Sequence, residues 1–195
     1  AMAAIAGTEE RVRATLGEVV WGVDDDTLDS VAVGWLRKRQ VTVAIGESAT
    51  AGMLTSMLAG NDRSATCFRG SIVVPATEED EGGAVGLARM ALSRFPADIG
   101  LGVSGRLVPG SDPEMDEIQI ALLWPSRGME EVTVQRARHF RQRAMGAYHA
   151  LDELRKLRWR YEGDSDWRSA FYEAYEPDGE LYFFAHFLDA EYPRS

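Results

Sequence analysis

The most chemically suggestive stretch of the sequence is Glu47-Ser48-Ala49-Thr50-Ala51-Gly52, which lies between two apolar runs. A serine at a strand-to-helix turn can act as a nucleophile when a base activates it and N–H groups await the oxyanion. The first N–H groups of the following helix would supply such donors, and they would equally hold a phosphate. The simpler alternative is that Ser48 or Thr50 only caps the helix. On local sequence alone we favour the cap, because Thr50 stands where the nucleophile elbow G-x-S-x-G requires its second glycine.

A second polar stretch, Ser104-Gly105-Arg106, begins an expected loop over 104–113, which includes Gly110. The guanidinium of Arg106 is suited to a phosphate or carboxylate ligand, or alternatively to an internal pair with Asp80 that would fill a pocket. The preceding letters GLGVSG match G-x-G-x-x-G literally. Their first residues read as the strand itself and no helix opens after them, so we reject a dinucleotide fingerprint.

The remaining polar residues give little indication of a metal-binding or cofactor-binding site. The three histidines, His139, His149 and His186, are not at ligand spacing. The carboxylates of residues 78–81 are suited to Mg²⁺ or Ca²⁺, but such charge runs are usually solvated loops. We therefore expect no metal and no cofactor.

Charge and composition restrict the partners and the compartment. The formal net charge is −10, and an acidic protein repels nucleic acid and anionic lipid. No apolar run approaches the roughly 20 residues of a membrane helix, and the first residues lack the basic start of a signal peptide. The single cysteine, Cys67, excludes an internal disulfide and agrees with a reducing compartment. We expect a cytoplasmic protein that binds neither nucleic acid nor membrane.

The pattern of apolar residues predicts alternating helices and strands, hence an α/β domain with helices flanking a mixed sheet. We expect helices over about 8–20, 27–39 (capped by the acidic run 24–26), 50–60, 84–95 and 139–157, strands over 41–45, 68–74 and 98–103, and a hairpin of 117–124 with 130–135. Ligands in such sheets sit beyond the carboxyl ends of strands. The stretches at Ser48 and Ser104 both follow strands, so we expect them to form two walls of one pocket.

From residue 158 onward the composition changes, because eleven of the 18 aromatic residues fall between Trp159 and Tyr192. We interpret 1–157 as the main domain and 158–195 as an aromatic-rich extension packed on it. The alternative is a partner or dimer surface. Within the extension, 167–175 reads as a short helix and 180–188 as a strand.

Read together, these motifs resemble the CinA C-terminal domain family, whose active members are nicotinamide mononucleotide deamidases. The family carries E-S-C-T-G-G where this chain has Glu47 to Gly52, and F-R-G-G-V-V-A-Y-S-N-E-A-K where it has FRGSIVVPATEED (68–80). A family segment like ADIGLAITG-IAGPGG corresponds to ADIGLGVSGRLVPGS (97–111). The resemblance spans about 28–157. It implies a three-layer CinA C-terminal-like fold and a homodimer.

The resemblance also implies a set of site residues. Ser48 corresponds to the family's serine and is the catalytic candidate, and the small-ligand contacts would be Glu47, Thr50, Gly52, Ser104, Gly105, Arg106 and Gly110. Arg136 or Arg138 stands for the arginine of a family G-D-R segment, and we leave that choice open.

The residues that act with this serine in the family are replaced. Its tyrosine position is Pro75 and its lysine position is Asp80, while the only lysines of the chain are Lys38 and Lys156. A carboxylate near a serine disfavours the alkoxide that a cation would favour. We therefore place first a catalytically silent relative that binds a small nucleotide, an anion or a protein partner. The alternatives are a deamidase that uses Ser48, and an altered hydrolase that uses Asp80.

Overall fold

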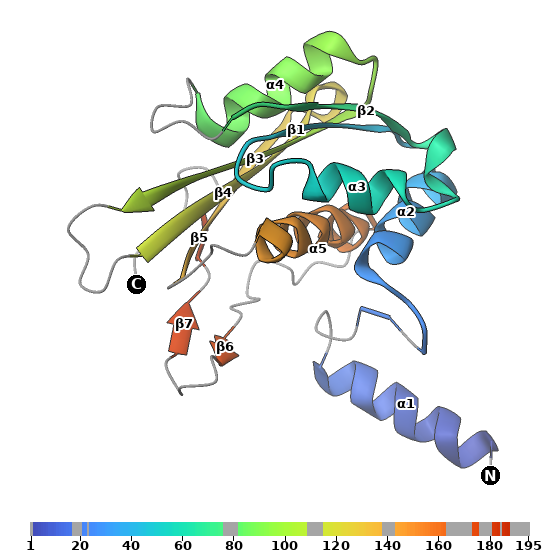
Figure 1. Ribbon diagram of the computed structural model, residues 1–195. Helices are drawn as coiled ribbons and strands as arrows, with labels where there is room; N and C mark the ends of the chain where they lie inside the picture. Colours follow the sequence, from blue (N-terminus) through green and yellow to red (C-terminus); the bar gives the residue numbers. More distant parts are fainter. Residues whose placement is uncertain are drawn as a thin grey trace.

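The computed structural model describes residues 2–16, 21–22, 24–75, 82–108, 115–137, 143–162, 173–175, 181–183 and 185–187 (Figure 1). Its elements, in chain order, are α1 (Met2–Leu16), α2 (Leu28–Arg39), β1 (Val43–Glu47), α3 (Met53–Ala59), β2 (Phe68–Val73), α4 (Gly83–Arg94), β3 (Ile99–Val108), β4 (Met115–Trp124), β5 (Met129–Ala137), α5 (Arg143–Glu162), β6 (Glu173–Tyr175), β7 (Leu181–Phe183) and β8 (Ala185–Phe187).

The main sheet is mixed and has helices on both faces. Its six strands follow the order β2-β1-β3-β4-β5-β8. β1 runs parallel to β2 and to β3, whereas the β3–β4, β4–β5 and β5–β8 pairs are antiparallel. In Figure 1, α4 covers one face, and α2, α3 and α5 lie on the other. The three-layer α/β fold and the β4–β5 hairpin are thus confirmed.

The hydrophobic core lies between the sheet and the layer of α2, α3 and α5. All five residues of β1 are buried, as expected for a parallel strand covered on both faces. Val43 and Ile45 of β1 pack with Leu101 and Val103 of β3 and with helix residues such as Leu151. The continuous apolar run in this part of the sequence therefore reflects burial on two sides.

Glycines allow α4 to lie very close to the opposite face of the sheet. A Cβ atom added at Gly102 would lie 1.8 Å from the carbonyl oxygen of Ala84, and one at Gly46 would lie 2.2 Å from that of Leu87. The glycines at positions 100 and 102 of the GLGVSG stretch therefore serve close helix–sheet packing. This role is consistent with our rejection of a dinucleotide fingerprint.

The start of α2 corrects one sequence prediction. Thr27, rather than the acidic run 24–26, is the N-cap. Its Oγ1 accepts from Ser30 N (3.4 Å), and Ser30 Oγ accepts from Thr27 N (2.9 Å), which forms a capping box. A reciprocal pair of side-chain bonds thus fixes the start of the helix.

Beyond the end of α5 at Glu162, the described parts of the aromatic extension are strands. Glu173–Tyr175 forms β6, paired with β7, so the predicted helix is wrong for these three residues. β8 pairs with Val132–Val134 of β5 and becomes the sixth strand of the main sheet. Residue 158, where the composition changes, lies inside α5. The packing of the aromatic rings lies outside the described side chains.

Within the part of the chain that the structure describes, no helix is both long and apolar enough to cross a membrane.

Candidate functional site at the ends of β1 and β3

The structure brings the two predicted pocket walls side by side. Glu47, the last residue of β1, is in register with Val103 of β3, and Ser48 N donates to Val103 O at 2.9 Å. A Cβ atom added at Gly105 would lie 2.8 Å from the Cβ of Ala49. Ser48 therefore follows β1 directly, and Ser104 follows the β3 position that pairs with the end of β1, so the predicted neighbourhood of the two stretches is found. Ser104 itself lies inside β3, which continues to Val108, so the predicted loop is wrong for residues 104–108.

Glu47 is the residue that caps α3. Its side chain is fully buried, and its Oε1 accepts hydrogen bonds from Thr55 N (3.0 Å) and from the Thr55 hydroxyl. Its Oε2 accepts from Leu54 N (3.3 Å) and from the Thr50 hydroxyl. The formal N-cap, Gly52, makes no side-chain cap bond. The prediction that Ser48 or Thr50 caps this helix is thus corrected: a carboxylate at the end of the preceding strand does so.

This cap changes what the turn can bind. The N–H groups of Leu54 and Thr55 are bonded to Glu47, Ala51 N donates to Ser48 O (3.1 Å), and Met53 N donates to Thr50 O (3.0 Å). These four donors are therefore not available to an oxyanion or a phosphate. The Glu47 carboxylate therefore accepts from helix N–H groups that the sequence analysis assigned to a bound oxyanion or phosphate.

Ser48 itself lies deep beside this cap. Its residue is only 2% exposed, and its Oγ lies 3.5 Å from Val103 O, which is a weak hydrogen bond. Thr50 is also buried. Pro75, at the family's tyrosine position, is exposed just beyond β2. Asp80, at the lysine position, lies outside the described residues, as does the acidic run 78–81.

The remaining predicted ligand contacts are placed in part. Gly52 adopts a φ of 92° at the start of α3, a conformation that glycine tolerates best. Arg106 lies on β3 in register with Glu117, and its side chain is not described. Gly110 and Arg138 lie outside the described residues. The ligand-binding role of all seven predicted residues stays a prediction.

A second polar group, which the sequence interpretation missed, lies on the α4 face of the same strand end. Ser104 is in register with Gln119, whose Nε2 donates to Glu117 Oε1 at 3.0 Å. Ser104 and Glu117 are buried. The signal in the sequence was the alternation of Glu117 and Gln119 with isoleucines, which indicates a strand with one polar face at its start.

Both lysines lie away from Ser48. Lys38 is in the last turn of α2, and β1, which spans roughly 13 Å, separates that helix from the site. On α5 a Cβ atom added at Gly146 would lie 3.1 Å from Thr50 Cγ2, which marks where this helix passes the site. Lys156 is ten residues further along, or about 15 Å.

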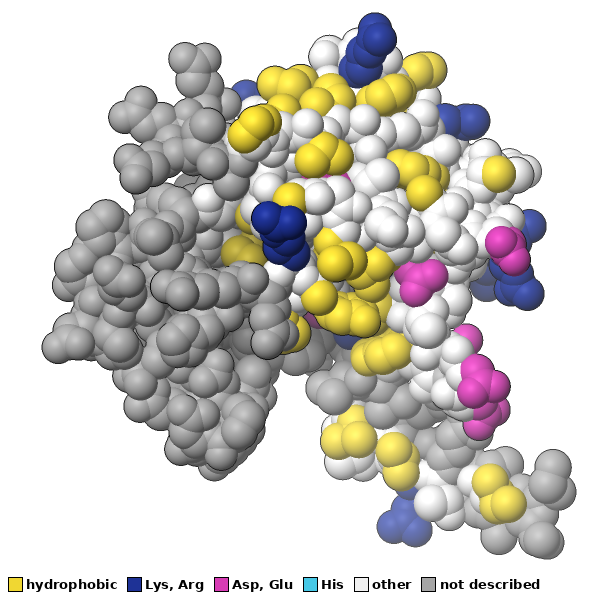
Figure 2. All heavy atoms as spheres, in the orientation of Figure 1, with side chains coloured by type: hydrophobic (Ala, Val, Ile, Leu, Met, Phe, Trp, Pro, Cys, Tyr) yellow, Lys and Arg dark blue, Asp and Glu magenta, His cyan; other side chains and the backbone are white. Residues whose placement is uncertain are grey.

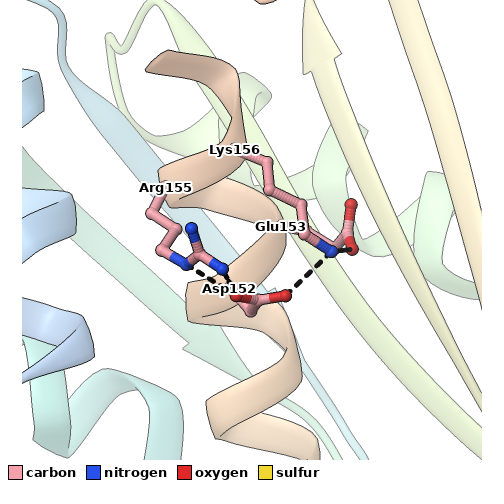
Figure 3. A network of polar contacts seen from close by, with 4 residues as sticks. All are labelled: Asp152, Glu153, Arg155 and Lys156. Atoms are coloured by element: carbon pink, nitrogen blue, oxygen red, sulfur yellow. Dashed lines mark hydrogen bonds and ion pairs between the residues drawn. The ribbon is translucent and has the colours of Figure 1, made fainter. Parts of the chain in front are cut away.

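Lys156 is also held by its own helix. Its Nζ lies 2.8 Å from Asp152 Oδ2 and 2.7 Å from Glu153 Oε1, while Arg155 pairs with the same aspartate (Figure 3). One turn before this network, burial lowers the pKa of His149, and the nearby Asp152 and Glu153 only partly offset that effect.

An open groove of about 610 Å³ lies elsewhere, between the start of α2 and the end of α3. Asp24, Asp25, Asp26, Asp29 and Asp62 line it, and acidic side chains gather at one side of the view in Figure 2. No three histidine, cysteine or acidic residues in the described ranges are placed to hold a metal ion.

Comparison with known proteins agrees with this fold. No family model matches the chain. A CinA-like protein of Frankia casuarinae is 33% identical over 175 aligned positions, which cover 78% of this chain and 40% of that protein. A competence-damage inducible protein of Moorella thermoacetica is 30% identical and covers 78% of this chain. The chain thus spans about two fifths of the length of these relatives.

Solved structures show the same architecture at lower identity. A competence or damage-inducible protein of Enterobacter asburiae matches 69% of this chain and 99% of its own, with a TM-score of 0.56 at 18% identity. A CinA superfamily protein of Klebsiella pneumoniae covers 68% of this chain with a TM-score of 0.55. Because a third of its aligned residues are shared with a curated CinA-like protein over most of its length, this chain belongs to the CinA-like family.

Proposed function

We propose that this chain is a CinA-like domain that has lost amide hydrolysis and keeps a small-ligand pocket at the carboxyl ends of β1 and β3. The observation that carries the proposal is the absence of a lysine near Ser48: Lys156 is paired within α5, and Lys38 lies beyond the opposite end of β1. A lysine that helps a serine to ionise must stand close to its hydroxyl.

Electrostatics supports the loss of hydrolysis. Asp80 takes the position of the family's lysine, so an anion replaces a cation. A cation and an anion ~4 Å from a serine hydroxyl differ by several kcal/mol in their effect on its alkoxide at an effective dielectric near 20. That difference corresponds to several powers of ten in rate.

The retained pocket is supported by the pairing of the end of β1 with the middle of β3. Ser104 and Gly105 lie beside the Ser48 turn, and Arg106, the next residue on β3, is suited to bind the anionic part of a small nucleotide. The second role open to a catalytically silent relative is a protein interaction, including the formation of a homodimer. It would use the surface of the domain rather than these strand ends.

The first experiment is ammonia release from nicotinamide mononucleotide. The purified chain, its Ser48→Ala variant and an active member of the family are assayed side by side. We expect the active member to release ammonia and both forms of this chain to stay at background. A thermal-shift screen of nucleotides and anions then measures binding, since a ligand that binds only the folded state raises Tm.

The competing function is a deamidase that uses Ser48, favoured by the retained serine beside Val103 at the end of β1. Turnover by the wild-type chain that disappears in Ser48→Ala would overturn the loss of hydrolysis. Turnover that survives in Ser48→Ala would point to another nucleophile. A screen in which no nucleotide or anion raises Tm would remove the ligand pocket.

A further inference from the structure

The first helix, α1, carries a stripe of apolar side chains that is exposed to solvent. Ile5, Val12 and Leu16 are 62%, 43% and 48% exposed, and the other described side chains of α1 are exposed as well. In Figure 1, α1 stands apart from the sheet and from the helices that cover it. Successive residues of a helix turn by about 100°, so residues 5, 12 and 16 lie within about 40° of one line, over a length of about 17 Å.

This stripe needs a covering partner more than a single exposed apolar residue would. An isolated helix of about 15 residues is only marginally stable in water, and most helices depend on the packing of one apolar face. The polar residue beside the stripe makes no demand on a partner, because Thr15 Oγ1 donates to Arg11 O at 2.8 Å within α1. The exposed face of α1 is therefore suited to another apolar surface.

The distribution of charge favours a second copy of α1 as that surface. The helix contains two glutamates and two arginines, so it is formally neutral, and the whole net charge of −10 belongs to the rest of the chain. Two acidic domains repel each other when they approach directly. Two neutral helices that stand apart from these domains can meet without that repulsion.

The order of the charges selects an antiparallel pair. By helical periodicity, positions 9 and 13 lie on the same side of the stripe, at about 40° and 80° from position 5. In an antiparallel pair that side faces the same side of the other helix. With Ile5 level with Leu16 of the second copy, Glu9 lies within about 1.5 Å along the axis of the level of Arg13 of the second copy. A parallel pair would instead set the charged side against the side that carries threonines.

We propose that α1 is a self-association surface, which pairs antiparallel with α1 of a second copy of this chain and buries Ile5, Val12 and Leu16 of both. The helix precedes residue 28, where the family motifs begin, so the resemblance does not itself imply this contact. Three apolar side chains per helix form a small interface beside the roughly 800 Å² per partner of a standard one, so we expect a concentration-dependent equilibrium in the micromolar range. The pair requires neither the ligand pocket nor the loss of hydrolysis.

The test is sedimentation velocity of the full chain without an N-terminal tag. We expect the average mass of the wild-type chain to rise about twofold between about 1 and about 100 μM. Val12→Glu and Leu16→Glu should keep the mass at its low-concentration value, because each would bury an unpaired charge in the stripe. Glutamate is at least as good a helix former as valine, so Val12→Glu does not act through helix propensity.

Ala14→Glu is the matched control. It adds the same charge to the same helix, but position 14 is exposed and lies about 180° from position 5, on the opposite face. Its mass should rise with concentration as that of the wild-type chain does.

Exchanging the charges tests the antiparallel direction. Glu9→Arg alone and Arg13→Glu alone would each set like charges at one level of the pair, and each should weaken association by about threefold to tenfold. The combined variant Glu9→Arg/Arg13→Glu restores opposite charges, so its association should return to that of the wild-type chain.

Three results would overturn the helix pair. The first is a wild-type mass that does not rise with concentration, and the second is equal association of the wild-type chain, Val12→Glu and Leu16→Glu. The third is a combined charge variant that associates no better than the single ones. Each of these results would leave the proposed function in place, since the ammonia assay and the thermal-shift screen measure the strand-end pocket and not α1.

Discussion

At the scale of single residues, the Glu47 carboxylate is the central feature of the site. It ties the end of β1 to the start of α3 through four hydrogen bonds, two from backbone N–H groups and two from threonine hydroxyls. We expect Glu47→Gln to lower the free energy of unfolding by about 1–3 kcal/mol, because the amide NH₂ would face donors instead of accepting from them. Urea denaturation measures this change.

Glu130→Gln is the control for Glu47. Glu130 is half exposed and pairs with Arg89 at 2.8 Å on the surface, so its substitution should change stability by no more than about 0.5 kcal/mol. Equal effects of the two substitutions would contradict the assigned cap.

His149 provides a pH dependence at the same scale. Burial lowers its pKa in the folded state, with Lys156 adding to the shift and Asp152 and Glu153 opposing it. The unfolded chain therefore binds the proton more readily, and stability falls as pH drops below the unfolded value of about 6.5. We expect the urea midpoint to decrease between pH 7.5 and 5.5, and to decrease less in His149→Gln. The same slope in the variant would show that other groups cause the loss.

At the scale of elements, the close approach of α4 to the sheet depends on glycine. Gly102→Ala would place a methyl group 1.8 Å from Ala84 O, so α4 must move away. We expect a loss of about 3 kcal/mol or more, at the upper end of overpacking effects. Gly34→Ala is the matched control on α2, where an added Cβ meets nothing within 4 Å, and it should stabilise by about 0.5–1 kcal/mol. Effects of the same sign at both positions would contradict the packing.

At the scale of the whole molecule, the end of the chain completes the main sheet. β8 pairs with Val132–Val134 of β5, which would otherwise be an edge of the sheet. We expect a chain truncated after Glu162 to have a lower Tm and to aggregate on heating, since an unpaired edge is a template for intermolecular pairing. Truncation after Leu188 removes residues beyond β8 and is the control. Equal thermal unfolding and light scattering of the two truncations would show that β8 adds nothing.

The sequence by itself determined the order and type of most elements, because the local spacing of apolar residues shows whether an element is buried on one face or on two. The β1, β2 and β3 strands, the β4–β5 hairpin and the family all followed from short segments in a fixed order. The proximity of Ser48 to Ser104 also followed, since neighbouring parallel strands run in register, but the extension of β3 beyond Ser104 to Val108 did not.

Only the tertiary structure decided which polar groups meet. The Glu47 carboxylate accepts from Leu54 N and Thr55 N, which lie seven and eight residues further along the chain. The sequence pattern had instead indicated Ser48 or Thr50 as the cap. The meeting of Ser104 with Gln119, and of Gly83 with both, depends on the β3–β4 register and on how closely α4 lies on the sheet. Periodicity records which face of an element is buried, but it does not record which element covers that face. The chemistry of this site depends on that second property.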